Sequence, residues 1–262
     1  QVPGDKSISH RALMIGGLAT GETRIEGLLE GEDVLATAEA LRSLGVSSEK
    51  TADGNWLVNG RGVSGLAEPA QVLDMGNSGT AARLLMGVLA AHPFSATLSG
   101  DDSLNSRPMG RIIDPLSKMG ATFQSRSGGR LPLNMTGLAD PLPIKYELPV
   151  ASAQVKSAIL LAGLGAAGKT RVIELKPTRD HTELMLRHFG AKVDVEDLPG
   201  GARAVTVHGQ PELSARDVMV PGDISSAAFP MAAALLIPGS KVTIKGVGIN
   251  PLRAGLVETL RE

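Results

Sequence analysis

Residues 3–19 of the chain have the sequence PGDKSISHRALMIGGLA, in which a Pro-Gly turn is followed by small polar residues and then by an apolar segment. This order indicates the start of a helix. In the simplest interpretation, Asp5 or Ser7 caps the helix by accepting hydrogen bonds from its free N–H groups. Lys6 and Arg11 allow a second interpretation, because a helix N-terminus already favours an anion. Taken alone, the segment favours the cap.

Related segments recur along the chain and strengthen the second interpretation. They begin about 70 to 75 residues apart, which is typical of repeated supersecondary units. They are GNSGTAARLLMGVLAA at 76–91, ASAQVKSAILLAGLG at 151–165 and PGDISSAAFPMAAALLIPG at 221–239. Each is rich in small apolar residues, and a helix that is apolar all round is usually buried on every side.

The same kinds of segment follow each of these helices. Short β-rich runs occupy 23–28, 95–100, 170–175 and 241–246. Second helices occupy 33–45, 107–120, 179–190 and 250–262. Alternating residues interrupted by glycine then predict β-hairpins within 50–60, 123–137 and 192–209. The cyclic unit is therefore β-α-β-α-β-β, and the chain contains three complete units and about half of a fourth.

These patterns predict an α/β fold in which buried helices lie inside a shell of strands and outer amphipathic helices. We assign residues 1–214 to a first domain of three units and 215–262 to the start of a second domain. Since a hairpin is expected after the helix at 250–262, and the first residue is Gln rather than Met, we expect the chain to be cut at both ends.

Composition argues against several classes of function. The chain has 26 Lys and Arg residues against 27 Asp and Glu, and only 2% aromatic residues, which argues against a nucleic-acid partner. The absence of cysteine excludes disulfides, thiolate metal sites and a cysteine nucleophile, and it suits a reducing compartment. The longest apolar runs are too short and too interrupted by Pro and Gly to span a membrane.

Residues 163–170 match the G-x-x-x-x-G-K-[ST] pattern of nucleotide-binding P-loops. A P-loop requires a strand before the loop and a helix that begins at the Lys-Thr pair, so that helix N–H groups face the phosphates. Here the order is reversed, because an apolar helix precedes the match and the strand at 170–175 follows it. We interpret the match as a turn after a helix, with Lys169 at the start of a strand.

Polar residues near the helix starts suit an anion site better. They are Lys6, Arg11, Asn77, Gly79, Thr80, Arg107, Ser152, Gln154 and Arg179. Taken singly, each is most often a cap or a solvated charge. If the units pack about a common axis, however, the helix N-termini converge and form a surface rich in N–H donors. The arginines suit bidentate recognition of a carboxylate or a phosphate. Together with the helix N-termini, they predict a site for one or two small, highly charged anions.

Proton-transfer groups give a weaker signal. Asp5, Asp33 and Asp223 lie in or near helix starts, and we expect them to cap helices or to pair with nearby cations. The five histidines have no metal-ligand spacing. No nucleophile-base pair indicates covalent catalysis. The predicted site is therefore an anion clamp that lacks its acid and base.

Together, the motifs resemble the 5-enolpyruvylshikimate-3-phosphate synthase family, particularly its bacterial branch that includes glyphosate-tolerant enzymes. The matching strings are PGDKSISHRAL, GNSGTAARLL, SRPMGR, ASAQVKSAILLAGL, TRDHTE and PGDISSAAF, and the likeness covers essentially all 262 residues. The resemblance implies the inside-out α/β barrel of enolpyruvyl transferases, with six β-α-β-α-β-β units in two domains. Somewhat over one third of such an enzyme would be absent from this chain.

The resemblance also implies a reaction. The enolpyruvyl group of phosphoenolpyruvate would be transferred to the 5-hydroxyl of shikimate 3-phosphate, with release of phosphate, on the shikimate pathway to aromatic amino acids. No metal or organic cofactor is implied. We expect the full-length enzyme to be a monomer in the cytoplasm, with neither a membrane nor a nucleic-acid partner.

Motif matches assign the site residues that the resemblance implies. Those for shikimate 3-phosphate are Lys6, Ser7, Arg11, Ser152, Ala153, Gln154 and Arg179. Those for phosphoenolpyruvate are Lys6, Asn77, Gly79, Thr80, Arg107 and Gln154. Lys6 would contact both substrates and take part in catalysis. Ala153 stands where some relatives have serine, so any contact would come through its backbone.

The acid and base carboxylates of the family come from the second domain, beyond Glu262. We therefore expect this chain alone to bind substrate without turnover. Glyphosate is the expected inhibitor. Tolerant relatives place alanine where this chain has Gly79, which leaves room beside the phosphoenolpyruvate site and predicts a glyphosate-sensitive full-length enzyme.

Other functions stay open on the sequence. The enolpyruvyl transferase that acts on UDP-N-acetylglucosamine shares the repeat, but its usual cysteine is impossible here and SISHR after Lys6 does not match its Lys-Asn opening. The chain could also be a non-catalytic anion-binding module, or half of a split enzyme that acts with a partner chain. A P-loop NTPase is the least favoured of these alternatives.

Overall fold

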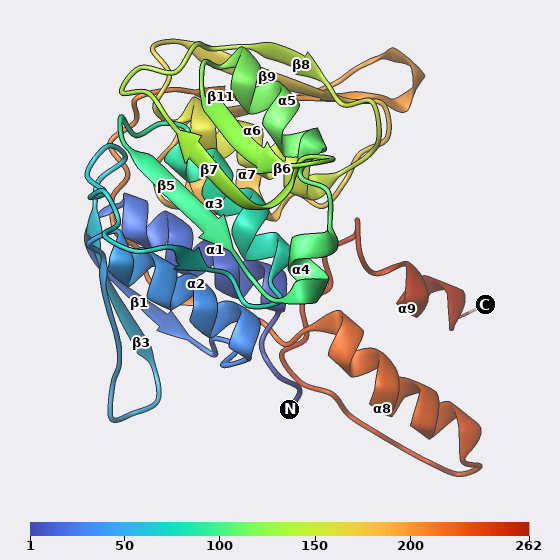
Figure 1. The fold of residues 1–262 in the computed structure, drawn as a ribbon. Coiled ribbons are helices and arrows are strands. Elements are labelled where there is room, and N and C mark those ends of the chain that lie inside the picture. The colour runs from blue at the N-terminus through green and yellow to red at the C-terminus, as the bar shows by residue number, and fades with distance from the viewer. Residues whose placement is uncertain (262) are drawn as a thin grey trace.

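A computed structural model of the chain describes residues 1–261. Three apolar helices lie in its interior: α1 (Lys6–Leu18), α3 (Gly79–Leu89) and α6 (Ala153–Gly163). They run through the middle of the body, with strands and outer helices around them (Figure 1). Nearly all of their side chains are buried, because small residues allow the helix backbones to approach closely. The predicted burial of these helices is confirmed.

Each interior helix begins at a short polar cap. Asp5 accepts a hydrogen bond from the Ile8 N–H at 2.9 Å, and Ser78 and Ser152 cap α3 and α6 in the same way. A cap of this kind satisfies one of the N–H groups that a helix start leaves without a partner. The cap predicted for residues 3–19 is confirmed, with Asp5 rather than Ser7 as the capping residue.

Strands form three four-stranded sheets around these helices. In spatial order, the first contains β12 (Val218–Met219), β1 (Thr20–Glu26), β3 (Trp56–Arg61) and β2 (Ser47–Lys50). The second contains β4 (Leu73–Asp74), β5 (Ser95–Ser99), β7 (Arg130–Thr136) and β6 (Thr122–Arg126). The third contains β8 (Lys145–Glu147), β9 (Lys169–Glu174), β11 (Arg203–His208) and β10 (Val193–Asp197).

All three sheets have the same pairing. The first two strands of each are parallel, and the remaining pairs are antiparallel. This is the predicted β-α-β-α-β-β unit, since a parallel pair needs a crossover such as α3 or α6, whereas hairpins give antiparallel pairs. In the first sheet, the leading strand is β12, from the segment 215–262. Val218 pairs with Ile25 and Met219 with Glu26.

The predicted second helices form as α2 (Glu32–Ser43), α5 (Gly110–Lys118) and α7 (His181–His188). Helix α5 starts three residues later than predicted. Arg107 is extended, as is usual before a proline, and Pro108 makes a bridge with Arg130. A short helix that the sequence did not predict, α4 (Asp102–Ser106), fills the turn before it, and a 3₁₀ turn (Pro199–Gly201) lies in the third hairpin.

The order of elements at the P-loop match is the predicted one. Helix α6 ends at Gly163 and β9 begins at Lys169, so the match lies between a helix and a strand. A helix N-terminus that could receive a nucleotide phosphate does not follow Lys169.

The fourth unit agrees with the prediction only in part. Helix α8 (Ile224–Leu236) forms, but the strand predicted at 241–246 was wrong, because that segment has no strand structure. Strands β1, β5 and β9 each pair on both sides, and no strand among residues 1–261 offers such a partner to 241–246. Of the helix predicted at 250–262, only α9 (Gly255–Thr259) forms, and Glu262 lies outside the described residues.

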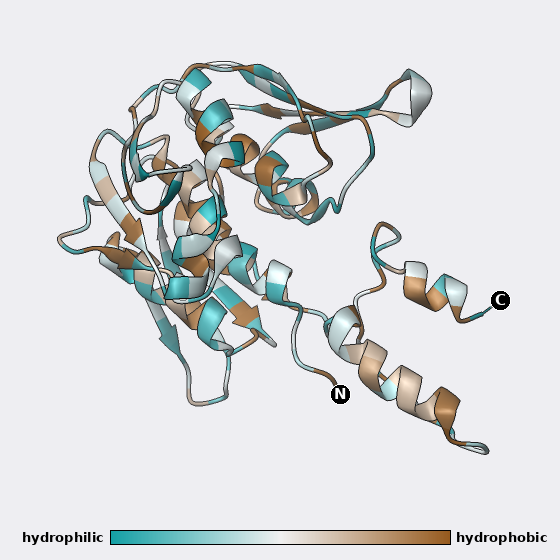
Figure 2. Cartoon of the chain, turned by 45° about the vertical axis from the view of Figure 1, so that its right-hand side comes forward, coloured by the Kyte–Doolittle hydropathy of each residue, from teal (hydrophilic) through white to brown (hydrophobic). Residues whose placement is uncertain are grey.

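Helices α8 and α9 project from the body (Figure 1), and most residues of α8 are apolar (Figure 2). Phe229, Leu235 and Leu236 of α8 are exposed. None of the helices within residues 1–261 has the length and apolar character needed to cross a membrane. The assignment of 1–214 and 215–262 to separate domains stays a prediction.

Candidate anion-binding site

Side chains near the three interior helix N-termini bond to one another. Arg11 of α1 donates from Nη2 to Ser157 Oγ of α6 at 2.7 Å. Gln154 of α6 donates from Nε2 to Thr80 Oγ1 of α3 at 3.0 Å. Because these helices belong to three different units, the helix N-termini converge as the repeat predicts. The free N–H groups and positive dipole ends of α1, α3 and α6 therefore act on one region.

Arg11 lies beneath this region and joins three helices. Its Nε donates to Thr182 Oγ1 at 2.7 Å, and its Nη1 donates to the Ser7 carbonyl at 2.8 Å. Thr182 Oγ1 also lies 2.6 Å from Ser157 Oγ. Arg11 is only 4% exposed, and burial lowers the pKa of its guanidinium to about 10, so that it stays charged at neutral pH.

Arg179 approaches the same helix from the loop between β9 and α7. Its Nη1 lies 3.5 Å from Ser7 Oγ, and the side chain is half-buried. Burial, and then the charge of Arg253, lower its pKa. The structure thus brings together Ser7, Arg11 and Arg179, which the motifs assigned to one substrate.

A second group of predicted residues gathers at α3. Arg107 Nη2 donates to Asn77 Oδ1 at 2.8 Å and to Ser103 Oγ at 3.0 Å. Asn77 in turn donates to Asp101 at 2.7 Å, and this bond is the main cause that lowers the pKa of the Asp101 carboxyl. Arg107 is therefore held in place by hydrogen bonds to neutral groups.

Arg83 belongs to this group, and the sequence analysis missed it. Its Nη1 donates to the Gly79 carbonyl at 3.1 Å and to Gln154 Oε1 at 3.2 Å. Burial, and then the charges of Arg107 and Arg111, lower its pKa. The available signal was its position four residues after Gly79, on the same face of the helix.

Lys6 has a different environment from the arginines. Its ammonium lies 2.8 Å from Asp33 Oδ2, at the start of α2, and the Lys6 side chain is 52% exposed. This pairing was predicted as the alternative to proton transfer by Asp33. Because the pair is exposed, its net stabilisation is small, and an anionic ligand could compete for the ammonium.

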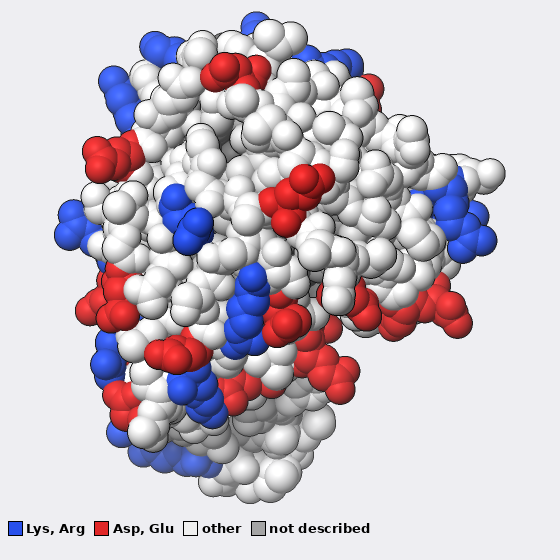
Figure 3. Space-filling view, turned by 60° about the vertical axis from the view of Figure 1, so that its left-hand side comes forward, with Lys and Arg blue, Asp and Glu red and all other residues white. Residues whose placement is uncertain are grey.

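Four guanidinium groups around the helix N-termini form no ion pair with a carboxylate of residues 1–261. They are those of Arg11, Arg83, Arg107 and Arg179. On the outer face of the molecule, by contrast, basic and acidic side chains are interspersed (Figure 3). Guanidinium groups that gather at helix N-termini without an ion pair make this region suited to a ligand with several negative charges.

The region is open to a ligand of modest size. A cavity of about 450 Å³ is lined by residues that include Arg83, Ser152 and Gln154. Ser152 caps α6 and Ala153 is the first residue of that helix, so both lie at its positive end. Of the residues assigned to the two anions, Ser152 and Gln154 line this cavity.

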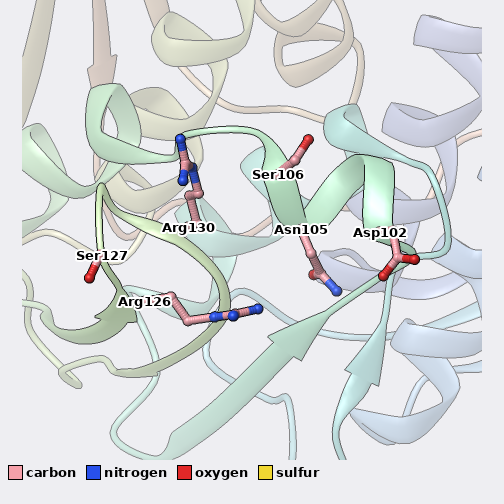
Figure 4. A pocket seen from close by; sticks show the side chains of 6 residues that line it. All are labelled: Asp102, Asn105, Ser106, Arg126, Ser127 and Arg130. Carbon is pink, nitrogen blue, oxygen red and sulfur yellow. The ribbon is translucent and has the colours of Figure 1, made fainter.

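Another cavity, of about 330 Å³, lies apart from these helix N-termini. Asp102 and Asn105 of α4 and Arg126 and Arg130 of the β6–β7 hairpin line it (Figure 4). Its side chains come from a surface turn and a hairpin, and none of the predicted site residues is among them. It carries no part of the candidate site.

The carboxylates near the helix N-termini are already engaged. Asp5 caps α1 and accepts from Arg253 at 2.9 Å, and Asp223 caps α8, as predicted for both. His10, buried beside Thr37, has its pKa lowered to about 3 by burial and then by Arg11, so it is neutral at pH 7. Within residues 1–261, His, Cys, Asp and Glu side chains form no cluster of three that could hold a metal ion.

Comparison with known proteins identifies the family. The sequence profile described as EPSP synthase (3-phosphoshikimate 1-carboxyvinyltransferase) matches residues 1–262. The chain belongs to the EPSP synthase family. Curated relatives named 3-phosphoshikimate 1-carboxyvinyltransferase include those of Paramagnetospirillum magneticum and Parvibaculum lavamentivorans, which are 67% and 64% identical over 261 residues. A solved structure described as EPSP synthase from Acinetobacter baumannii matches with a TM-score of 0.91 at 50% identity.

The chain spans just over half the length of these EPSP synthases. Each match covers 100% of this chain but only 58% of the relative. The comparisons confirm the predicted family and its mixed α/β fold. The names of the relatives also favour an EPSP synthase over the related enzyme that acts on UDP-N-acetylglucosamine.

Proposed function

We propose that this chain binds shikimate 3-phosphate and phosphoenolpyruvate, and that it provides part of the site for enolpyruvyl transfer to the 5-hydroxyl of shikimate 3-phosphate, with release of phosphate. The observation that carries the proposal is the group of four arginines without carboxylate partners at converging helix N-termini. Both substrates carry a phosphate and a carboxylate. Bringing them together requires fixed cations in a site with little water.

The two groups of side chains suit the two substrates. We propose that Ser7, Arg11 and Arg179 bind shikimate 3-phosphate, together with Ser152, Gln154 and the backbone of Ala153. We propose that Asn77, Gly79, Thr80 and Arg107 border the phosphoenolpyruvate site. Lys6 at the start of α1 and Gln154 at the start of α6 would contact both substrates. Arg83 joins the second group because it contacts both Gly79 and Gln154.

The chain alone should bind without turnover. Enolpyruvyl transfer requires an acid for the enol carbon and a base for the hydroxyl. The carboxylates near the helix N-termini are engaged in caps and ion pairs, as Asp5 and Asp33 are. We therefore propose that the acid and base come from the part of the relatives that this chain does not span. We expect that full-length protein to act as a cytoplasmic monomer.

Calorimetric titration with shikimate 3-phosphate, with and without phosphoenolpyruvate, tests the binding part of the proposal. Arg179→Gln should weaken binding by about 10-fold, since a hydrogen bond to a charged group contributes about 1.5–3 kcal/mol. Arg171→Gln is the matched control, because Arg171 pairs with Glu196 on an outer strand. Equal affinities of the two variants would refute the assignment of Arg179, and turnover by the unmodified chain would refute the expected inactivity.

Glyphosate tests the phosphoenolpyruvate side. A Cβ added at Gly79 would lie 2.6 Å from Arg83 Nη1 and 3.3 Å from Arg107 Nη1. Gly79→Ala should therefore displace Arg83 and narrow the pocket, and it should reduce inhibition of the full-length enzyme by glyphosate. Equal inhibition constants for the two enzymes would count against placing this pocket at Gly79.

A further inference from the structure

The interior of the third unit contains a buried lysine that the proposed reaction does not use. Lys156, in the first half of α6, is 0% exposed. Its ammonium lies 2.8 Å from Glu174 Oε2, at the end of β9, and 2.6 Å from Glu183 Oε1 on α7. It also donates to the Thr178 carbonyl at 3.4 Å. Removing three charged groups from water has a high cost in desolvation free energy, so we expect this cluster to have a function.

The three partners of Lys156 lie along one loop and its two ends. The loop occupies residues 175–180, between β9 and α7. Glu174 precedes it, Thr178 lies within it and Glu183 follows it in α7. The Thr178 hydroxyl also donates to Glu174. A single ammonium thus ties the middle of the loop to both of its flanking elements.

This loop depends on polar contacts for its conformation. Leu175 is 56% exposed, and residues 176 and 177 are exposed as well, so apolar burial contributes little to its order. The charged cluster is therefore the main buried attachment between the loop and α6.

Two guanidinium groups of the candidate site are held through these elements. Arg179 belongs to the loop and reaches Ser7. Thr182, adjacent to Glu183 in α7, accepts a hydrogen bond from Arg11 Nε at 2.7 Å. Moving the loop or the first turn of α7 would therefore move Arg179 and release one of the contacts that orient Arg11.

A purely stabilising role explains the cluster poorly. Among residues 1–261, nothing donates to the buried Glu183 Oε2, and burial raises the pKa of the Glu183 carboxyl. Replacing a buried ion pair by apolar residues is often neutral or stabilising, and here one oxygen is left unsatisfied as well. What the cluster does provide is a fixed geometry across three elements.

We propose that Lys156 is a positioning residue, which holds the 175–180 loop and α7 so that Arg179 and Arg11 face the phosphate and carboxylate of shikimate 3-phosphate. The inference rests on the proposed function for its ligand. The fixed geometry of the loop is a property of the ligand-free chain and can be tested separately.

The first test is amide hydrogen exchange in the ligand-free chain. Lys156→Met has a side chain that is one atom shorter and carries no charge. It should accelerate exchange of the Leu184 amide, which donates to the carbonyl of Asp180 at the end of the loop at 3.0 Å. The expected acceleration of this loop exchange is about 10-fold, the effect of losing one charge-assisted hydrogen bond. Amides of α3 should keep their exchange rates. Because Lys156→Met leaves two buried carboxylates without a countercharge, the triple variant Lys156→Met/Glu174→Gln/Glu183→Gln provides a neutral cluster that does not depend on a buried charge for folding.

The second test is a double-mutant cycle on shikimate 3-phosphate affinity. Lys156→Met and the triple variant should each weaken binding by about 10-fold when Arg179 is present. In the Arg179→Gln variant they should have a smaller effect, because only Arg11 is then left to be positioned. Lys118→Met is the matched control, since Lys118 pairs with Asp114 on the exposed side of α5. It should leave both loop exchange and affinity unchanged.

The outcomes separate the two proposals. Unchanged loop exchange in both Lys156→Met and the triple variant would overturn the positioning role. An affinity of the triple variant equal to that of the unmodified chain would also overturn it. So would an equal loss of affinity on Lys156→Met with Arg179 and with Gln at position 179. Failure of the unmodified chain to bind shikimate 3-phosphate would refute the proposed function instead. In that case the exchange rates alone decide whether Lys156 fixes the loop.

Discussion

Helices α6 and α8 occupy equivalent places in successive units, yet only α6 is buried. Both begin at a polar cap, and both are rich in alanine and leucine. In α6, every residue from Val155 to Gly163 is buried, whereas in α8 only Ile224 and Ala227 are. Phe229 and Leu236 of α8 are 79% and 81% exposed. Most residues of α8 are apolar (Figure 2).

The contrast shows that the signals that form a helix differ from the contacts that bury it in a core. The cap and the helix-forming residues act locally, so they produce a helix in both units. Burial requires neighbours, and α6 has α3 on one side and strands of its own sheet on another. Helix α8 has no such neighbour among residues 1–261. Substitutions that are costly in α6 should therefore cost little in α8.

The largest expected difference concerns leucine truncation. Leu160→Ala in α6 removes a side chain that is 0% exposed and should lower the free energy of unfolding by about 2–5 kcal/mol. Leu236→Ala in α8 should change it by less than about 0.5 kcal/mol. Urea denaturation followed by circular dichroism measures both. Equal losses would show that α8 is packed in solution, for instance by self-association.

A smaller difference in stability is expected between two glycine-to-alanine substitutions, one in α3 and one in α9. A Cβ added at Gly87 of α3 would lie 2.3 Å from the Ala158 carbonyl oxygen of α6, so Gly87→Ala should force these helices apart and cost about 1–3 kcal/mol. Gly255→Ala in α9 meets no atom within 4 Å and should stabilise its helix by up to about 1 kcal/mol. Gly87→Ala should lower the melting temperature, whereas Gly255→Ala should leave it unchanged, because α9 has no buried residue. Similar shifts would contradict the close approach of α3 and α6.

The last expected effect concerns pH. Burial, and then Arg11, lower the pKa of His10 from 6.5 to about 3, so the unfolded chain binds a proton in this range that the folded chain does not. Stability should therefore fall as the pH drops below about 6.5, by about 1 kcal/mol per pH unit. The His10→Gln chain should lose this contribution between pH 6 and pH 4, as measured by urea titration. An unchanged pH slope in His10→Gln would disprove the buried neutral histidine.

Local patterns predicted most of the fold. Polar caps, alternating hairpin residues and glycine after helices are short-range signals, and they located every interior helix and all three hairpins. The strand predicted at 241–246 failed because a strand requires a partner, and the pattern of a segment does not show whether one is present. The sequence analysis did not predict α4 or the late start of α5. Pro108 favours an extended conformation at Arg107, and this effect was not considered.

The candidate site was predicted less completely. The residues found from the sequence lie at or near helix starts, or in the segments that lead into helices, where motif and position coincide. Arg83 and Lys156 were missed because each lies in an apolar helix pattern, and their roles depend on Gln154, Glu174 and Glu183 from other elements. Partners of this kind are set by tertiary packing, which spacing along the chain does not show.

The pairing of β12 with β1 also constrains how the body can assemble. Ile25 finds its parallel neighbour, Val218, only after all strands of the other two sheets have been synthesised. Until then, one side of β1 offers unpaired backbone groups that another chain could bind. Closing so long a loop carries a large entropic cost and slows folding. The first sheet to begin during translation is thus the last to be completed, and the nascent protein is most open to aggregation in that interval.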